Sequence, residues 1–151
     1  MTLTGCGSDA ETSSASGDTA SSAATEAVSE VTIKPAGNQM KYEQEDFTVE
    51  AGSEVMLTFD NVSTSAAMKH NVVILTGTGE DMVQRVGTAA LQAAENEYIP
   101  EDDAVLAATD LADPGETVTM TFTAPSEPGT YTYICTFPGH YMMMQGTMTV
   151  V

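Results

Sequence analysis

A short segment near the C-terminus holds three side chains that could bind one metal ion. Cys135 is followed at once by a turn, which Pro138 and Gly139 force. His140 then stands five residues after the cysteine, and Met144 stands four residues after His140. A loop this short can return all three side chains to one point. A thiolate, an imidazole and a thioether are soft or borderline donors, which suit copper and do not suit calcium or magnesium.

A fourth donor lies far upstream, in the sequence Met68-Lys69-His70-Asn71. The chain has only two histidines, and both fall in these two segments. A buried cysteine or a lone histidine is more often structural, but the joint spacing favours a metal site. Two histidines, one cysteine and a weak axial methionine are the ligands of blue copper electron-transfer sites. The predicted ligands of one copper ion are therefore His70, Cys135, His140 and Met144.

Most of the elements that must position these donors are predicted strands. Polar and apolar residues alternate in several stretches, which is the pattern of a strand with one face in the core. These stretches are residues 47–49, 55–59, 117–122 and 131–135, and the apolar run 72–75 suits a buried strand. Turn-forming residues stand between them. The sequence therefore predicts an all-β sandwich.

One stretch breaks this alternation. From Asp81 to Ala94, apolar residues recur at spacings of three and four among good helix formers. This pattern predicts one short helix, inserted between two strands of the sandwich.

The N-terminal segment differs in character from the rest of the chain. Between Gly7 and Glu30 every residue except Val28 is Ser, Thr, Ala, Gly, Asp or Glu. Such a segment cannot bury enough apolar area to offset the entropy of ordering. We therefore predict a lipobox-like start and a disordered, acidic linker over residues 1–30, followed by a folded copper-binding domain over residues 31–151.

The start of the chain, Leu3-Thr4-Gly5-Cys6, resembles the lipobox of bacterial lipoproteins, in which the signal peptide is cut before a cysteine that is then lipidated. A polar tether directly after this cysteine suits a domain anchored at a membrane surface. The basic and apolar regions that precede a lipobox are missing here, so an incidental cysteine in a tail is the alternative. A disulfide between Cys6 and Cys135 is disfavoured, because Cys6 lies in a segment that cannot pack. Cys6 is thus a candidate lipid anchor.

The chain is strongly acidic. Its 22 acidic residues face 4 basic ones, which gives a formal net charge of −18. Such a surface repels nucleic acid phosphates and anionic lipid head groups, so neither is an expected partner, and membrane contact would come only through a lipid anchor. A basic protein partner, a saline habitat and a simply solvated surface all fit this charge. No stretch approaches the roughly 20 continuous apolar residues that span a bilayer.

The C-terminal segment resembles the ligand loop of the azurin and auracyanin branch of the cupredoxins, which are type 1 blue copper proteins. The shared core is Cys-Thr-Phe-Pro-Gly-His at residues 135–140, and the methionine four residues later has the azurin spacing. The His-Asn pair at residues 70–71 is similar to the azurin pattern, and residues 37–40 and 98–103 are similar to further azurin segments. The resemblance spans residues 31–151 and implies the cupredoxin fold, an all-β Greek-key β-sandwich.

The resemblance also implies a role for each residue of the copper site. The two histidines and Cys135 would form the trigonal plane, with Met144 as the axial ligand of one type 1 copper ion. Backbone N–H groups of Asn71 and Phe137 would donate to the Cys135 sulfur and tune the reduction potential.

The function that the resemblance implies is transport of single electrons by cycling between Cu(I) and Cu(II). Electrons would pass through the solvent-facing edge of His140. The apolar patch around this edge would include Met40, Met68 and Met142. A monomeric protein in the periplasm, or elsewhere outside the cytoplasm, would exchange electrons with redox proteins such as cytochromes or with respiratory or photosynthetic complexes. No enzymatic activity is expected, because four protein ligands leave no open coordination position for a substrate.

The sequence departs from these relatives at three points. Lys69 stands where azurins have a glycine whose carbonyl approaches copper, so the presence of a weak fifth ligand is left open. Azurins carry a disulfide at the far end of the barrel, and residues 31–151 hold a single cysteine. Auracyanins place the axial methionine one residue further along, where this chain has Gln145. Gln145 could ligate copper only if the loop shifted.

A copper carrier or storage protein without a dedicated electron-transfer role is the alternative function. The run Met142-Met143-Met144 could supply further soft sites for Cu(I), although methionine more often fills an irregular loop. A zinc site, which one cysteine and two histidines also suit, ranks below copper because a thioether is a poor zinc ligand.

Overall fold

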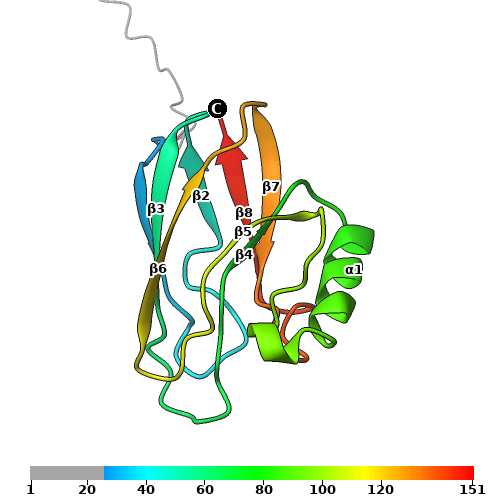
Figure 1. The fold of residues 1–151 in the computed structure, drawn as a ribbon. Coiled ribbons are helices and arrows are strands. Elements are labelled where there is room, and N and C mark those ends of the chain that lie inside the picture. The colour runs from blue at the N-terminus through cyan, green and yellow to red at the C-terminus, as the bar shows by residue number, and fades with distance from the viewer. Residues whose placement is uncertain (1–25) are drawn as a thin grey trace, which may run out of the picture.

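Two β-sheets make up most of the computed structural model, which describes residues 26–151. In chain order the strands are β1 (Glu30–Ile33), β2 (Asp46–Val49), β3 (Glu54–Asp60), β4 (Val73–Leu75), β5 (Val105–Ala108), β6 (Thr117–Thr123), β7 (Gly129–Ile134) and β8 (Gln145–Val150). The smaller sheet has the order β1-β3-β6 and the larger sheet the order β2-β8-β7-β4-β5 (Figure 1). β1 runs parallel to β3 and β2 parallel to β8, whereas the other pairs are antiparallel. The five stretches predicted as strands fall on β2, β3, β4, β6 and β7, with only Val72 and Cys135 just outside a strand, which confirms the predicted all-β sandwich.

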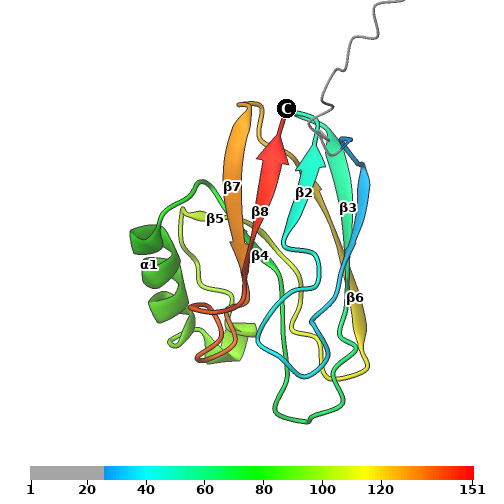
Figure 2. The ribbon, with the colours of Figure 1, turned by 180° about the vertical axis from the view of Figure 1, so that it is seen from behind.

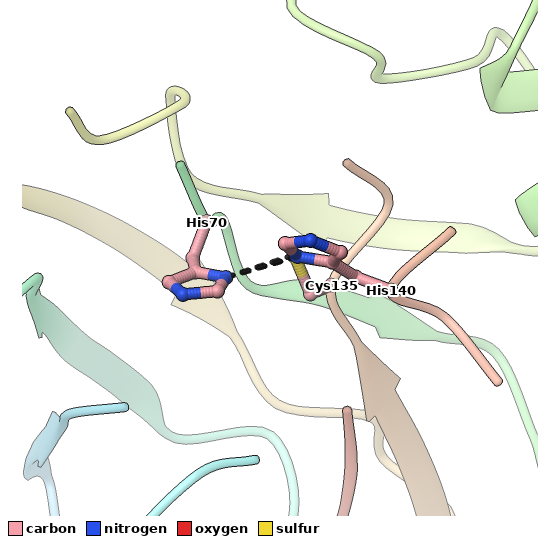
Figure 3. Close-up of side chains that lie close together, drawn as sticks. All are labelled: His70, Cys135 and His140. Atoms are coloured by element: carbon pink, nitrogen blue, oxygen red, sulfur yellow. Dashed lines mark hydrogen bonds between the residues drawn. The ribbon is translucent and has the colours of Figure 1, made fainter. Parts of the chain in front are cut away.

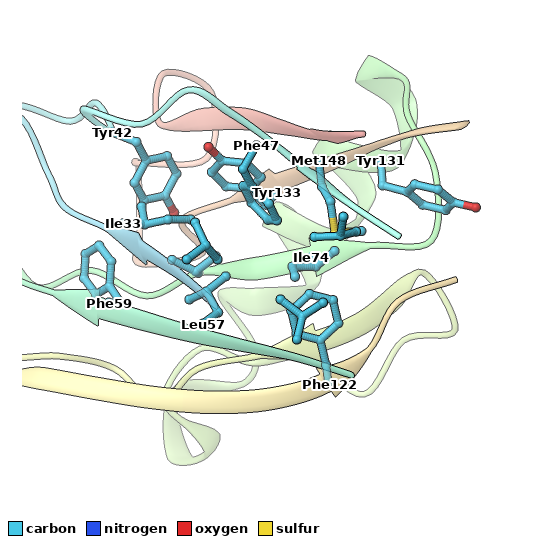
Figure 4. Close-up of a cluster of buried hydrophobic side chains, with 14 of the residues drawn as sticks. Ile33, Tyr42, Phe47, Leu57, Phe59, Ile74, Phe122, Tyr131, Tyr133 and Met148 are labelled. Atoms are coloured by element: carbon cyan, nitrogen blue, oxygen red, sulfur yellow. The ribbon is translucent and has the colours of Figure 1, made fainter. Parts of the chain in front are cut away.

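The main hydrophobic core lies between the two sheets (Figure 4). β1, β3 and β8 bury every second residue, as the alternation in their sequences requires. Among the largest fully buried side chains are Tyr42 and Tyr133. Their hydroxyl groups donate to the backbone oxygens of Asn71 (2.7 Å) and Gln44, respectively. The core therefore buries large aromatic rings without leaving their polar groups unpaired.

β4 is buried on both of its faces, which explains why its sequence is continuously apolar rather than alternating. Ile74 belongs to the core between the sheets, whereas Val73 and Leu75 belong to a second cluster on the outer face. The helix α1 (Glu80–Ala90) covers this outer face with residues such as Val86 (Figure 2). The predicted helix between two strands is thus confirmed, between β4 and β5.

α1 is shorter than the predicted helix, which extended to Ala94. The backbone N–H groups of Leu91, Gln92 and Ala93 each bond to the carbonyl three residues earlier, so the helix tightens and ends. A 3₁₀ turn, η1 (Ala94–Asn96), follows. Because a 3₁₀ turn repeats every three residues, apolar spacing alone does not distinguish it from continued helix.

The two predicted metal-binding segments meet at the end of the sandwich that lies opposite the C-terminus (Figures 1 and 2). The C-terminal segment connects β7 to β8, and residues 68–71 lead into β4. β7 pairs with both β4 and β8. This pairing brings donors that are far apart in the sequence to one place.

The predictions for the N-terminal part of the chain lie mostly outside the described residues. Cys6 and the predicted linker up to residue 25 are not described, so the candidate lipid anchor and the start of the domain at residue 31 stay predictions. Within residues 26–151, β1 begins at Glu30, and none of the helices is long and apolar enough to cross a membrane.

Candidate metal centre

The loop between β7 and β8 begins with Cys135 and ends with Met144. Where the loop leaves the two strands, the Cys135 N–H donates to the Met144 carbonyl (3.0 Å). This hydrogen bond lies next to Ile134 and Gln145, the last paired residues of β7 and β8. Inside the loop, the Met144 N–H donates to the His140 carbonyl (2.8 Å). Gly139 has a φ of 82°, a backbone conformation that glycine adopts without strain. Main-chain hydrogen bonds therefore hold the three predicted loop donors relative to one another.

The backbone of His70 is held by an isolated bridge to Ala112, in which each N–H donates to the other residue's carbonyl (3.2 and 2.9 Å). The next residue, Asn71, joins this segment to the ligand loop. Its side-chain carbonyl accepts from the Thr136 N–H (2.8 Å), and its amide donates to the Thr136 hydroxyl (2.9 Å). Both residues are fully buried. Because Thr136 directly follows Cys135, this side-chain pair fixes the His70 segment relative to the cysteine.

The side chains of His70, Cys135 and His140 converge on one point (Figure 3). The Nδ1 atoms of the two histidines lie 3.1 Å apart, and the Cys135 Sγ lies 3.8 Å from the His70 Nδ1 and 3.7 Å from the His140 Nδ1. A circle through the corners of this triangle has a radius of about 2.1 Å, which agrees with the bonds of about 2.0–2.3 Å that nitrogen and sulfur ligands form with a metal ion such as zinc. The three side chains are thus spaced as ligands of one ion.

Burial sets the protonation states of these groups. His70 and Cys135 are fully buried, and His140 is 6% exposed. Burial lowers the pKa of His70 to about 4, with a further contribution from the neighbouring His140, and burial also lowers the pKa of His140. Burial raises the pKa of the Cys135 thiol to about 12, while hydrogen bonds from the backbone N–H groups of Asn71 and Phe137 act in the opposite direction. At neutral pH the metal-free centre therefore holds two neutral imidazoles and one protonated thiol.

Copper binding is expected to release about one proton per ion near pH 7, because the metal bonds to a thiolate. The proton comes from Cys135, since the lowered pKa values leave the histidines with no proton to lose. The apparent affinity should therefore rise about tenfold per pH unit through the neutral range, and it should fall more steeply in acid, where the histidines also take up protons, His70 below about pH 4. A Cu(II) titration of weakly buffered, metal-free protein with a pH indicator counts these protons. Release of two or more at pH 7 would contradict these protonation states.

The methionines of this region lie on different sides of the loop. Met144 is fully buried and belongs to the core cluster that contains the cysteine. Met143 lines a groove together with Met40 and Met68, whereas Met142 lies in a separate depression beside α1. Two residues of the predicted electron-entry patch thus share one surface, with Met143 rather than Met142 as the third methionine. The sequence did not identify Met143 as part of this surface. In a loop made of turns, the spacing of residues does not tell which way each successive side chain points.

Two residues left the ligand set open: Lys69 through its backbone carbonyl, and Gln145 through its side chain. The Lys69 ammonium pairs with the carboxylate of Asp113 (2.6 Å). The Gln145 amide donates to the carbonyls of Tyr141 (2.9 Å) and Met142 (3.3 Å), so its side chain is engaged within the loop. The Gln145 contacts favour the sulfur of Met144 over Gln145 at the axial position, which stays a prediction, whereas the Lys69 ion pair does not involve the carbonyl.

Helix α1 also contacts the ligand loop, a contact that the sequence did not predict. A Cβ atom at Gly87 would lie 2.3 Å from the ring of Tyr141, so only glycine lets this ring pack so closely on the helix. Tyr141 directly follows His140 and packs against the cluster beneath α1. A glycine inside a predicted helix is the sequence signal for such a contact, but it does not identify the residue that approaches.

Comparisons with known proteins agree with this centre. A family model described as copper binding proteins of the plastocyanin/azurin family matches residues 29–151. Auracyanin-A of Chloroflexus aurantiacus is 41% identical over 123 residues, which are 80% of this chain and 73% of that protein. Outer membrane protein H.8 of Neisseria meningitidis serogroup B is 35% identical over 119 residues, 76% of this chain and 63% of that protein. The crystal structure of dithionite-reduced auracyanin from the photosynthetic bacterium Roseiflexus castenholzii has a TM-score of 0.77 at 40% identity, covering 83% of this chain and 99% of that one.

Proposed function

Because this chain belongs to the plastocyanin/azurin family of copper-binding proteins, a family of blue copper electron carriers, we propose that it shuttles single electrons between redox proteins through one type 1 copper site. The proposed ligands are His70, Cys135, His140 and Met144. The observation that carries this proposal is the buried triangle of two imidazole nitrogens and one sulfur, with edges of 3.1, 3.7 and 3.8 Å. Copper held there supplies a one-electron couple, and the site needs no substrate.

The surroundings of the donors suit rapid electron exchange because they restrict movement. Cys135 and Met144 are paired at the neck of the loop, and Asn71 ties the His70 segment to Thr136. Ligands whose positions are fixed by packing and hydrogen bonds change little when the metal changes its oxidation state. Little energy is then needed to reorganise the site when an electron arrives or leaves.

The proposed port for electrons is the edge of His140. This residue is the one corner of the triangle that is partly exposed, and the other two corners are fully buried. The N–H of Met143 donates to the His140 carbonyl (3.0 Å), and Met143 also lines the groove that contains Met40 and Met68. The exposed edge of His140 therefore lies beside the methionine side chains of this groove, where a docked partner can exclude water.

The charge of the chain suits a basic partner. Residues 26–151 hold every lysine and arginine of the chain, and each of these four cations is paired with a carboxylate. The pairs are Lys34–Asp60, Lys41–Glu45, Lys69–Asp113 and Arg85–Asp102. The remaining acidic residues thus have no lysine or arginine left to offset them. We expect a basic redox protein, such as a cytochrome or a membrane complex, whose association slows as the salt concentration rises.

The proposed location is outside the cytoplasm, at a membrane surface. One similar protein carries the name of an outer membrane protein. The lipobox-like start makes Cys6 the proposed lipid anchor, with the acidic segment that follows it as the tether. Mass spectrometry of the native protein tests the anchor, and an unmodified Cys6 would contradict it.

Reversible one-electron cycling distinguishes an electron carrier from a copper store. We expect the Cu(II)-loaded protein to take up one electron per chain, to lose its colour, and to regain it on reoxidation. The copper should stay bound throughout, because the same buried donors hold both oxidation states. Voltammetry followed by copper analysis of the desalted protein measures both properties. Loss of copper on each reduction in the presence of a Cu(I) chelator would instead support the carrier or storage alternative.

A further inference from the structure

One groove at the metal-binding end is lined by three methionines from separate loops. Its volume is about 380 Å³, and the methionines are Met40, Met68 and Met143. We propose that this groove is a second metal site, which binds one Cu(I) ion through the three thioethers. The site uses none of the four proposed type 1 ligands, so it does not depend on the electron-transfer function.

The chemistry of the lining selects the ion. A thioether is a neutral, soft donor, which favours Cu(I) over harder ions such as Mg²⁺ or Ca²⁺. The other residues of the lining are Asn38, Gln39 and Lys41, so the groove offers no carboxylate, imidazole or thiolate. Divalent ions such as Zn²⁺ lack the ligands that they prefer here. The groove therefore suits a soft, monovalent ion.

The backbone beneath two of the methionines is fixed by hydrogen bonds. The Met68 N–H donates to the Ser65 carbonyl (2.9 Å), and the Met68 carbonyl accepts from the Asn61 amide (2.9 Å). The Met143 N–H donates to the His140 carbonyl (3.0 Å). With the backbone held in place, only the flexible thioether arms need to move to close on an ion.

The loop that carries the third methionine is fastened to the loop that carries Met68. The side-chain oxygen of Asn38 accepts from the backbone N–H groups of Thr64 (2.8 Å) and Ser65 (3.2 Å). The Ser63 hydroxyl donates to the carbonyl of Gly37 (2.8 Å). The loop that bears Met40 is therefore kept beside the other two donors without any contribution from a metal.

Electrostatics also favour a cation in this groove. The chain has a formal net charge of −18, and such a field raises the local concentration of cations. Lys41 is the one cation of the lining, and its ammonium pairs with Glu45 (3.3 Å), which offsets its charge. A Cu(I) ion here would lie next to the segments that bear the type 1 ligands, since Met68 precedes His70 by two residues and Met143 directly precedes Met144.

Titration of the reduced, copper-loaded protein with Cu(I), without oxygen and against a coloured Cu(I) chelator, tests the proposal. We expect two Cu(I) ions per chain, one at the type 1 centre and one in the groove. The variant M40L/M68L/M143L should hold one, because leucine keeps the apolar volume and removes the sulfur. The matched variant M56L/M82L/M120L changes three methionines that do not line the groove and should hold two.

Methyl signals locate the second ion. In reduced protein labelled with ¹³C at the methionine methyl groups, the second equivalent should shift the signals of Met40, Met68 and Met143 and leave Met56 and Met82 in place. A total of one Cu(I) per chain in the unmodified protein, a total of two in M40L/M68L/M143L, or shifts confined to Met142 would overturn the proposal. The colour of the Cu(II) form of M40L/M68L/M143L reports on the type 1 centre separately, and we expect it to be unchanged.

Discussion

Exchange of Cys135 for serine is expected to abolish the intense blue colour of the Cu(II) form. That colour requires charge transfer from a thiolate to Cu(II), which a serine oxygen cannot supply. The Cys135 sulfur forms one corner of the buried triangle, at 3.8 and 3.7 Å from the two histidine nitrogens. Serine keeps the backbone N–H that closes the loop onto Met144, so the loop can form without the sulfur.

The second cysteine of the chain supplies the control for this experiment. Cys6→Ser leaves the triangle intact and should keep the full blue colour. Visible absorption of both variants after addition of one equivalent of Cu(II) measures the effect, and circular dichroism checks that both are folded. An intensely blue Cys135→Ser protein would contradict the assignment of Cys135, and so would a colourless Cys6→Ser protein.

The ligand loop could be predicted from the sequence because its contacts are local. Cys135 and Met144 are nine residues apart, and a Pro-Gly turn between them leaves few ways to join two neighbouring strands. His70 is a different case. It approaches the loop only because β4 pairs with β7, and it was identified from sequence as the one other histidine available.

Other features of the centre depend on contacts that spacing does not encode. The Asn71 side chain bonds to Thr136, 65 residues away, and a sequence alone gives no reason to pair those two residues. Consecutive methionines diverge, since Met143 lines the groove with Met40 while Met142 lies beside α1. The Asn71–Thr136 contact and the directions of the methionines depend on how side chains pack where several loops meet. The spacing of residues along the sequence does not describe that packing.

Replacing Met144 by leucine is expected to keep copper bound and to raise the reduction potential. Met144 is fully buried, and its backbone contacts with Cys135 and His140 do not involve the thioether. Leucine has a similar volume, so the loss of folding stability should be about 1.5 kcal/mol or less. Loss of this fourth donor and its replacement by an apolar side chain destabilise the more highly charged Cu(II) more than Cu(I), so the substitution favours the reduced form. For a one-electron couple, each 1.4 kcal/mol or so of lost preference for Cu(II) raises the potential by about 59 mV.

Gln145→Leu is the control that separates the two candidates for the axial position. The Gln145 amide donates to the carbonyls of Tyr141 and Met142, so its loss weakens contacts within the loop but removes no donor from copper. We expect Gln145→Leu to leave the potential and the blue spectrum almost unchanged when both variants are compared by voltammetry and visible absorption. If the potential rose in Gln145→Leu and not in Met144→Leu, the axial ligand would be Gln145. The loop of the copper-bound protein would then have shifted by one residue, to the spacing that auracyanins use for their methionine.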